Sequence, residues 1–286
     1  MTGHDGRYHA FSLFYIRICR CAQVIKGFPF LLFILTLYLA GCNLFQRSEL
    51  IRVQKQRSAA NKYVAGNWME RRDVVREIVK YFGQDKNDLI IGTLLVASED
   101  PYSDVRIEAV KGLAIIKSEK ALDVIKKIAS DDKDGNVRWY AIKELRSFKD
   151  PSIAEIYIKG LGSNDWLIRE ESIKGALTMD DAIIKVKMIP YIIKAINDTS
   201  SNVVYTALQK VKTKDARLYQ AIANKFNSCS DYNYSLLEAS LIALNGYRLD
   251  TKTREKVINL LVYDNTHIRL LALRVLKKDK ILTMRQ

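Results

Sequence analysis

The residue types that most often carry out chemistry in proteins are scarce in this sequence. Its 286 residues include four cysteines and three histidines. His4 and His9 lie close to the N-terminus, and His267 has no second histidine or cysteine nearby. A zinc or di-iron site needs several such ligands, so we expect no metal and no cofactor. The sequence has no Gly-rich phosphate loop, Gly-x-Ser-x-Gly elbow or His-Glu-x-x-His helix, and we therefore expect that the protein is not an enzyme.

Residues 1–41 have the features of an export signal. Arg17, Arg20 and Lys26 precede an apolar stretch from Phe28 to Ala40. A basic region, a short apolar region and small residues before a cleavage site are typical of a secretory signal peptide. A membrane-spanning helix needs about 20 apolar residues, and this stretch is shorter. An ordinary short hydrophobic anchor with a chance cysteine is the alternative interpretation.

A cysteine follows this stretch directly, in the sequence Leu39-Ala40-Gly41-Cys42. These four residues resemble the lipobox of bacterial lipoproteins. The resemblance implies cleavage before Cys42, a diacylglycerol thioether on its sulfur and an acyl chain such as palmitate on its new amine. Two or more acyl chains are what stable membrane anchoring requires. Asn43 stands where an Asp would indicate inner-membrane retention, so the resemblance favours the outer membrane of a bacterial cell envelope.

The chain that follows the cleavage site is basic and poor in cysteine. Besides the lipidated residue only Cys229 remains, so we expect no intramolecular disulfide. The full sequence carries a net charge of +14; residues 1–41 contribute +3, from four basic residues and one acidic residue, which leaves +11. Near a membrane each basic residue attracts anionic headgroups by about 1 kcal/mol. Nucleic acid is a common partner of basic chains, but export argues against it here. A merely solvated basic surface is the alternative.

A helical repeat recurs at intervals of 31 to 35 residues. Each copy has an apolar lead residue, a small residue at position 4 and an apolar residue at position 5. The lead residues are Val105, Val137, Ile168, Val203, Leu236 and Ile268. The small residues are Ala109, Ala141, Ser172, Ala207, Ser240 and Ala272, and the position-5 residues are Val110, Ile142, Ile173, Leu208, Leu241 and Leu273. These positions form one stripe of an α-helix, and a small residue lets another helix approach closely. A degenerate copy begins at Val75-Arg76.

A second helix fits between successive copies. The segments with helical spacing are 119–130, 152–161, 182–196, 216–226 and 253–262, and turn-forming sequences such as 131–136 and 197–202 separate them from the first helices. Neither helix of such a hairpin can bury its apolar stripe without neighbouring repeats. The sequence therefore predicts an all-α fold, an α-solenoid of about six to seven helical hairpins.

These repeats resemble HEAT repeats, particularly the short form named from phycobilisome-lyase-like proteins. The resemblance rests on the turn acid, the Val-Arg pair and the following Ala, and it implies a HEAT-repeat α-solenoid over residues 70–286 with a lipidated N-terminus and tether over 42–69. In that family an acidic turn residue and the Arg six positions later form hydrogen-bond ladders between repeats. Pairs with this spacing are Glu70/Arg76, Asp100/Arg106 and Asp132/Arg138. The copies at Val203 and Leu236 lack the Arg.

The resemblance also places the Val-Arg helices on the inner, concave face. Positions that the core does not use should then point into the groove, and they include aromatic and basic residues, the types that dominate interaction hot spots. The candidate contacts to an acidic or mixed protein surface are Trp139, Tyr140, Lys143, Lys174 and Tyr205. The alternative is that the aromatic residues pack between repeats and the lysines are solvated.

Two functions are compatible with the sequence. The first is a lipid-anchored scaffold that binds another protein of the cell envelope, with the membrane reached through Cys42 and with neither nucleic acid nor metal as a partner. The second is an enzyme or an enzyme accessory of the HEAT-like lyase type. The scaffold is favoured because no catalytic constellation is present.

Overall fold

The computed structural model describes residues 48–82 and 88–284. The expected signal peptide and its box, Leu39 to Cys42, lie outside these described residues. The chain divides into two compact units, Met1–Ser58 and Ala59–Gln286. A helix covers residues 48–65. None of the described helices combines the length and the apolarity that a bilayer crossing requires.

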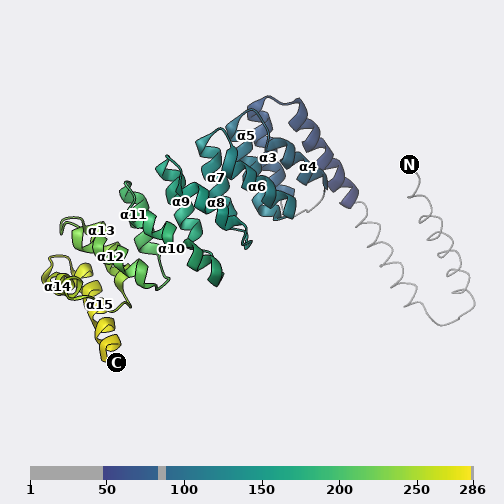
Figure 1. The fold of residues 1–286 in the computed structure, drawn as a ribbon. Helices are drawn as coiled ribbons and strands as arrows, with labels where there is room; N and C mark the ends of the chain where they lie inside the picture. The colour runs from purple at the N-terminus through teal and green to yellow at the C-terminus, as the bar shows by residue number, and fades with distance from the viewer. Residues whose placement is uncertain (1–47, 83–87, 285–286) are drawn as a thin grey trace, which may run out of the picture. The chain divides into compact units, whose positions relative to one another are not determined.

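The second unit is entirely helical over the residues that the structure describes (Figure 1). In chain order its helices are α3 (Trp68–Phe82), α4 (Asp88–Ala97), α5 (Ser103–Ile116), α6 (Glu119–Asp131), α7 (Gly135–Leu145), α8 (Ile153–Leu161), α9 (Trp166–Ala176), α10 (Ala182–Ile196), α11 (Ser201–Lys210), α12 (Ala216–Ser228), α13 (Tyr234–Leu244), α14 (Thr251–Asn259), the 3-10 helix η1 (Leu260–Val262) and α15 (Thr266–Met284). The odd-numbered helices carry the sequence repeat, and α6, α8, α10, α12 and α14 are the expected second helices.

The helices form two layers. Each odd-numbered helix contacts the next odd-numbered helix, from α3 through to α15, and each even-numbered helix contacts the next, from α4 through to α14. Figure 1 shows the successive hairpins following one another along the second unit. The described helices make six hairpins followed by α15, which confirms the predicted all-α solenoid.

Short polar side chains start most of these helices. The carboxylates of Asp134, Asp165 and Asp181 each accept a hydrogen bond from a backbone N–H in the first turn of the following helix. Before α3, Asn67 accepts from Glu70 N while the Glu70 carboxylate accepts from Asn67 N, which is a capping box. Each such cap stabilises its helix by about 1 kcal/mol and fixes where the turn ends.

The small and apolar columns of the repeat form the core. All six small residues at position 4 are completely buried. The position-5 residues are buried as well, except Leu273, whose side chain is 55% exposed. The expectation for Leu273 was wrong because position 5 is covered by the following repeat, and no described helix follows α15.

Arginine side chains connect adjacent repeats. Arg106 donates to both carboxylate oxygens of Asp132 in the next repeat, each at 2.8 Å, and to the backbone carbonyl of Asp100 at 2.8 Å. Arg169 binds the Asp198 carboxylate in the same way, also with two 2.8 Å contacts. The ladder implied by the resemblance therefore exists, with the carboxylate supplied by the following repeat.

The first rung of this ladder differs from the expected pairing of Glu70 with Arg76. Arg71 binds the Asp100 carboxylate at 2.7 and 3.0 Å, whereas Arg76 pairs with Glu108 at 3.1 Å. The first repeat therefore begins five residues earlier than its sequence pattern indicated. The reason is that Glu70 occupies the lead position, where the other copies have an apolar residue.

Candidate functional site

Two aromatic rings and two lysines gather on α5 and α7. The Trp139 and Tyr140 rings meet edge to face, with ring centroids 4.8 Å apart. The Lys143 ammonium lies 5.2 Å from the centroid of the Trp139 ring and 5.6 Å from that of Tyr140. From the previous repeat, the Lys111 ammonium lies 4.8 Å from the centroid of the Tyr140 ring. We call Lys111, Trp139, Tyr140 and Lys143 the aromatic–lysine cluster.

Helix periodicity explains how α7 positions its part of the cluster. Trp139 and Lys143 are four residues apart, so their side chains occupy one face of the helix. On the opposite side of α7, Val137 and Ala141 are buried in the core and fix the rotation of the helix. The cluster side chains are themselves half-buried, and the Trp139 and Tyr140 rings pack against the core.

The two lysines differ in their electrostatic surroundings. The Lys111 ammonium lies 3.0 Å from the Glu108 carboxylate, which also binds Arg76. Lys143 makes no ion pair with any residue in the described part of the chain, and its ammonium faces the two aromatic rings. A cation over an aromatic face is stabilised by about 0.5–2 kcal/mol and still retains its charge for an incoming group. Lys143 therefore offers the available positive charge in the cluster.

The partly buried acidic residue Glu144 follows Lys143 in the chain. Burial raises the pKa of the Glu144 carboxyl, while Lys143 and Lys111 act in the opposite direction. Farther along, the Arg146 guanidinium lies 2.7 Å from the Glu171 carboxylate, whose side chain is 3% exposed. These acids balance part of the basic charge, so the face is mixed in sign rather than uniformly positive.

The other two candidate residues have partners of their own. Lys174 on α9 lies 2.8 Å from the Glu170 carboxylate and 3.7 Å from that of Glu171. On α11 the Tyr205 hydroxyl accepts a hydrogen bond from Gln209 at 2.8 Å. Among the described residues, neither shares a hydrogen bond, ion pair or ring contact with the cluster. The structure thus brings together Trp139, Tyr140 and Lys143, and leaves Lys174 and Tyr205 in separate repeats.

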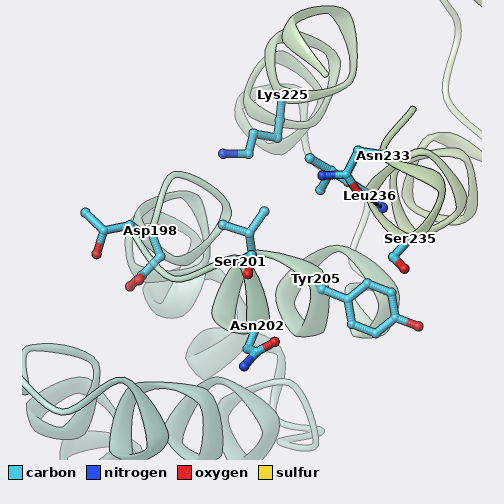
Figure 2. Close-up of a pocket in the computed structure, with 10 residues that line it drawn as sticks. Asp198, Ser201, Asn202, Tyr205, Lys225, Asn233, Ser235 and Leu236 are labelled. Carbon is cyan, nitrogen blue, oxygen red and sulfur yellow. Dashed lines mark hydrogen bonds between the residues drawn. The ribbon is translucent and has the colours of Figure 1, made fainter. Parts of the chain in front are cut away.

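Tyr205 instead lines a cavity of about 560 Å³ between the turns that precede α11 and α13. Figure 2 shows hydroxyl, amide, carboxylate and ammonium groups around it, with Lys225 reaching in from α12. Its lining residues are Asp198, Thr199, Ser201, Asn202, Val204, Tyr205, Lys225, Asn233, Ser235 and Leu236. This polar cavity is a feature that the sequence patterns did not indicate.

Neither Cys229 nor His267 lies in surroundings that would make its side chain reactive. Cys229 is buried, and burial raises the pKa of its thiol, which keeps it protonated and unreactive at neutral pH. His267 lies on the surface with Nε2 3.0 Å from the Glu238 carboxylate. Within the part of the chain that the structure describes, no group of three or more His, Cys, Asp or Glu side chains is placed to hold a metal ion.

Lys111 and the cavity were not among the residues and features predicted from the sequence. Lys111 occupies the same repeat position as Lys143 and Lys174, so the sequence repeat alone could have identified it as a candidate. Its approach to Tyr140 depends on how α5 stacks on α7, which no single repeat specifies. The cavity is lined by Val204, at the position where other repeats have an arginine, and the sequence shows that difference without showing the space.

Comparisons with known proteins agree with the fold. Residues 66–138 match the family model for HEAT repeats. No curated protein matches the sequence. Among solved structures, YibA of Escherichia coli is similar with a TM-score of 0.59 and 16% identity, over 76% of this chain and 80% of that one. The CpcE–CpcF complex of phycocyanin lyase from Nostoc is similar with a TM-score of 0.46 and 17% identity, over 79% of this chain and 94% of that one.

These likenesses bear on architecture alone. At 16% identity the similarity to YibA shows a shared fold, and the lower TM-score of the lyase complex supports no argument about activity. Residues 66–138, from the start of α3 into α7, carry HEAT repeats, and the remaining described helices continue the same two-layer, all-α solenoid.

Proposed function

We propose that this chain is a lipid-anchored scaffold of the bacterial cell envelope that binds an acidic or mixed protein surface through its odd-numbered helices. The observation that carries the binding proposal is the aromatic–lysine cluster. Its half-buried rings and its unpaired Lys143 have the composition of an interaction hot spot. Stacked repeats give such a cluster a rigid support, because α7 packs on both α5 and α9.

Charge reversal tests the binding part of the proposal. Lys143→Glu should weaken partner binding by roughly 30-fold, since a hot-spot residue contributes about 2 kcal/mol or more. The matched control is Lys127→Glu on α6, an exposed lysine in the other layer of helices. Equal affinities of the two variants for the purified partner, measured by calorimetry, would contradict this role of the cluster.

Intact-protein mass spectrometry tests the anchoring part. The proposal rests on Leu39-Ala40-Gly41-Cys42 and predicts, for protein extracted from its native membrane, cleavage before Cys42 plus the mass of a diacylglycerol and an acyl chain. Cys42→Ala should lose that added mass. An unmodified full-length mass for the natural sequence would refute lipid anchoring and leave the binding proposal to be judged separately.

A further inference from the structure

The turns before α3, α5, α7, α9 and α15 each bind a guanidinium group. In α5, the Arg106 Nη1 donates to the backbone carbonyls of Asp100 and Pro101, at 2.8 and 3.1 Å. The same contacts recur before α9, where Arg169 donates to the carbonyls of residues 163 and 164, each at 2.9 Å. Before α15, Arg269 donates to the carbonyls of residues 263 and 264, at 2.6 and 3.0 Å. Arg71 and Arg138 each donate to one such carbonyl.

The following repeat supplies the second half of this site. The carboxylates of Asp100, Asp132 and Asp198 each stand two residues before the N-cap of their helix, and each binds the arginine of the preceding repeat. Two carbonyls and one carboxylate thus surround the guanidinium. Contacts between a charged donor and several acceptors in a fixed fork are among the strongest hydrogen bonds in proteins.

Helix α11 keeps the acceptors and lacks the arginine. Val204 occupies the arginine position, and no side chain in the described part of the chain donates to the carbonyl of Asp198 or Thr199. The acid of the next repeat is also present, as Asp231, whose exposed carboxylate lies 3.5 Å from the Lys256 ammonium. Helix α13 lacks the arginine too, but there the Tyr263 hydroxyl donates to the Asp231 carbonyl at 2.5 Å.

Val204, at the position where other repeats have an arginine, lines the polar cavity of about 560 Å³. Its lining includes Asp198, Thr199 and Val204 on the α11 side and Asn233 on the α13 side, which are the two turns that an arginine at position 204 would connect. Figure 2 shows this space between the two turns, with Lys225 pointing across it. An open cavity therefore lies where this rung of the ladder is missing.

We propose that this cavity is a docking slot for an arginine side chain of a partner protein. The incoming guanidinium donates to the carbonyls of Asp198 and Thr199. The Asp231 carboxylate, which lines the neighbouring cavity, turns from Lys256 to meet it, so that the partner completes the interrupted ladder. Lys225 opposes a cation and swings towards solvent on binding, since its ammonium makes no ion pair with any described residue. The slot is independent of the aromatic–lysine cluster, which lies on other repeats.

Nuclear magnetic resonance titration of the isotope-labelled full chain tests the slot. The probe is the blocked amino acid N-acetyl-arginine methylamide, and inorganic phosphate is the competing probe. We expect saturable amide shifts at residues 198–204 and 231–236 with the arginine probe alone. Val204→Arg, which places the chain's own guanidinium in the slot, should abolish them. Asp231→Asn, a change at an exposed residue, should weaken binding by roughly threefold.

The variant Lys225→Ala distinguishes a site for a guanidinium group from a site for an anion such as phosphate. Removing a like charge that lines the same cavity should tighten binding of the arginine probe by roughly threefold. An anion site would respond in the opposite way, with phosphate shifts that disappear in Lys225→Ala. Phosphate shifts without arginine shifts, or arginine shifts that persist unchanged in Val204→Arg, would overturn the proposal, as would the absence of shifts with either probe.

Discussion

The Arg106 side chain connects two repeats through its hydrogen bonds. Its side chain is 5% exposed and its guanidinium is satisfied by two carbonyls of its own turn and by Asp132 of the next. Arg138 stands at the same repeat position and binds the Asp132 carbonyl, but the next repeat offers it no carboxylate because Ser163 occupies the place of the acid. The two arginines therefore differ chiefly in whether a carboxylate of the next repeat binds them.

Arg106→Ala should lower the free energy of unfolding by about 3 kcal/mol, because it leaves Asp132 with a buried and uncompensated charge. Arg138→Ala should lower it by about 1 kcal/mol, the contribution of an ordinary hydrogen bond. Urea unfolding followed by circular dichroism measures both. Equal losses for the two variants would mean that the Asp132 carboxylate does not contribute to the rung.

Asp100 makes stability depend on pH. Burial alone raises the pKa of its carboxyl, but hydrogen bonds from Arg71, Tyr102 N and Tyr63 outweigh burial and lower it below the ordinary value. A lowered pKa stabilises the folded state fully above the unfolded pKa, near 3.9, and this stabilisation is lost as the pH falls through the folded value.

Asp100→Asn should therefore show a smaller loss of unfolding free energy than the natural sequence as the pH falls from about 5 to 3. The surface variant Asp180→Asn should behave like the natural sequence, since its side chain is fully exposed. Urea unfolding at several pH values provides the measurement. A pH dependence that Asp100→Asn leaves unchanged would assign the acid sensitivity to other carboxylates.

The close packing of helices α8 and α9 depends on a glycine. A Cβ atom at Gly175 of α9 would lie 2.2 Å from the Tyr157 ring, and that ring is buried in α8. A Cβ atom at Gly92 of α4 would have nothing within 4 Å. The first glycine permits the approach of α9 to α8, whereas the second has no packing reason to be glycine.

Gly175→Ala should destabilise the protein by about 1–3 kcal/mol through overpacking. Gly92→Ala should stabilise it by about 0.5–1 kcal/mol, because alanine has the higher helix propensity. Thermal unfolding of both variants gives the comparison. An unchanged Tm for Gly175→Ala would show that Tyr157 can move and that α8 and α9 pack less tightly than the structure indicates.

The helices could be predicted from sequence because each repeat contains its own pattern. The stripe that ends in Ala141 and Ile142 is local to α7, and both residues are buried as expected. Trp139 and Lys143 could also be brought together, because four residues separate them on one helix. Contacts that depend on the neighbouring repeat could not be predicted, among them the approach of Lys111 to Tyr140 and the exposure of Leu273.

At the scale of the whole molecule, basic charge and ion pairing have to be considered together. The net charge is +14, yet Lys111 and Lys174 are both paired with glutamates of their own helices. A partner would therefore meet a face of mixed sign in which Lys143 offers the free charge. This favours a specific contact centred on α7 over a general attraction to any acidic surface.

Site-specific photo-cross-linking in living cells tests the central claim, that the aromatic–lysine cluster is where the scaffold binds its partner. The photoreactive phenylalanine analogue is placed at Trp139 or, as a control, at the exposed Lys127 on the other layer. We predict one discrete adduct to an envelope protein from position 139, its loss when Lys143→Glu is added, and none from position 127. The same adducts from both positions, or an adduct at 139 that Lys143→Glu leaves unchanged, would contradict partner binding through the cluster.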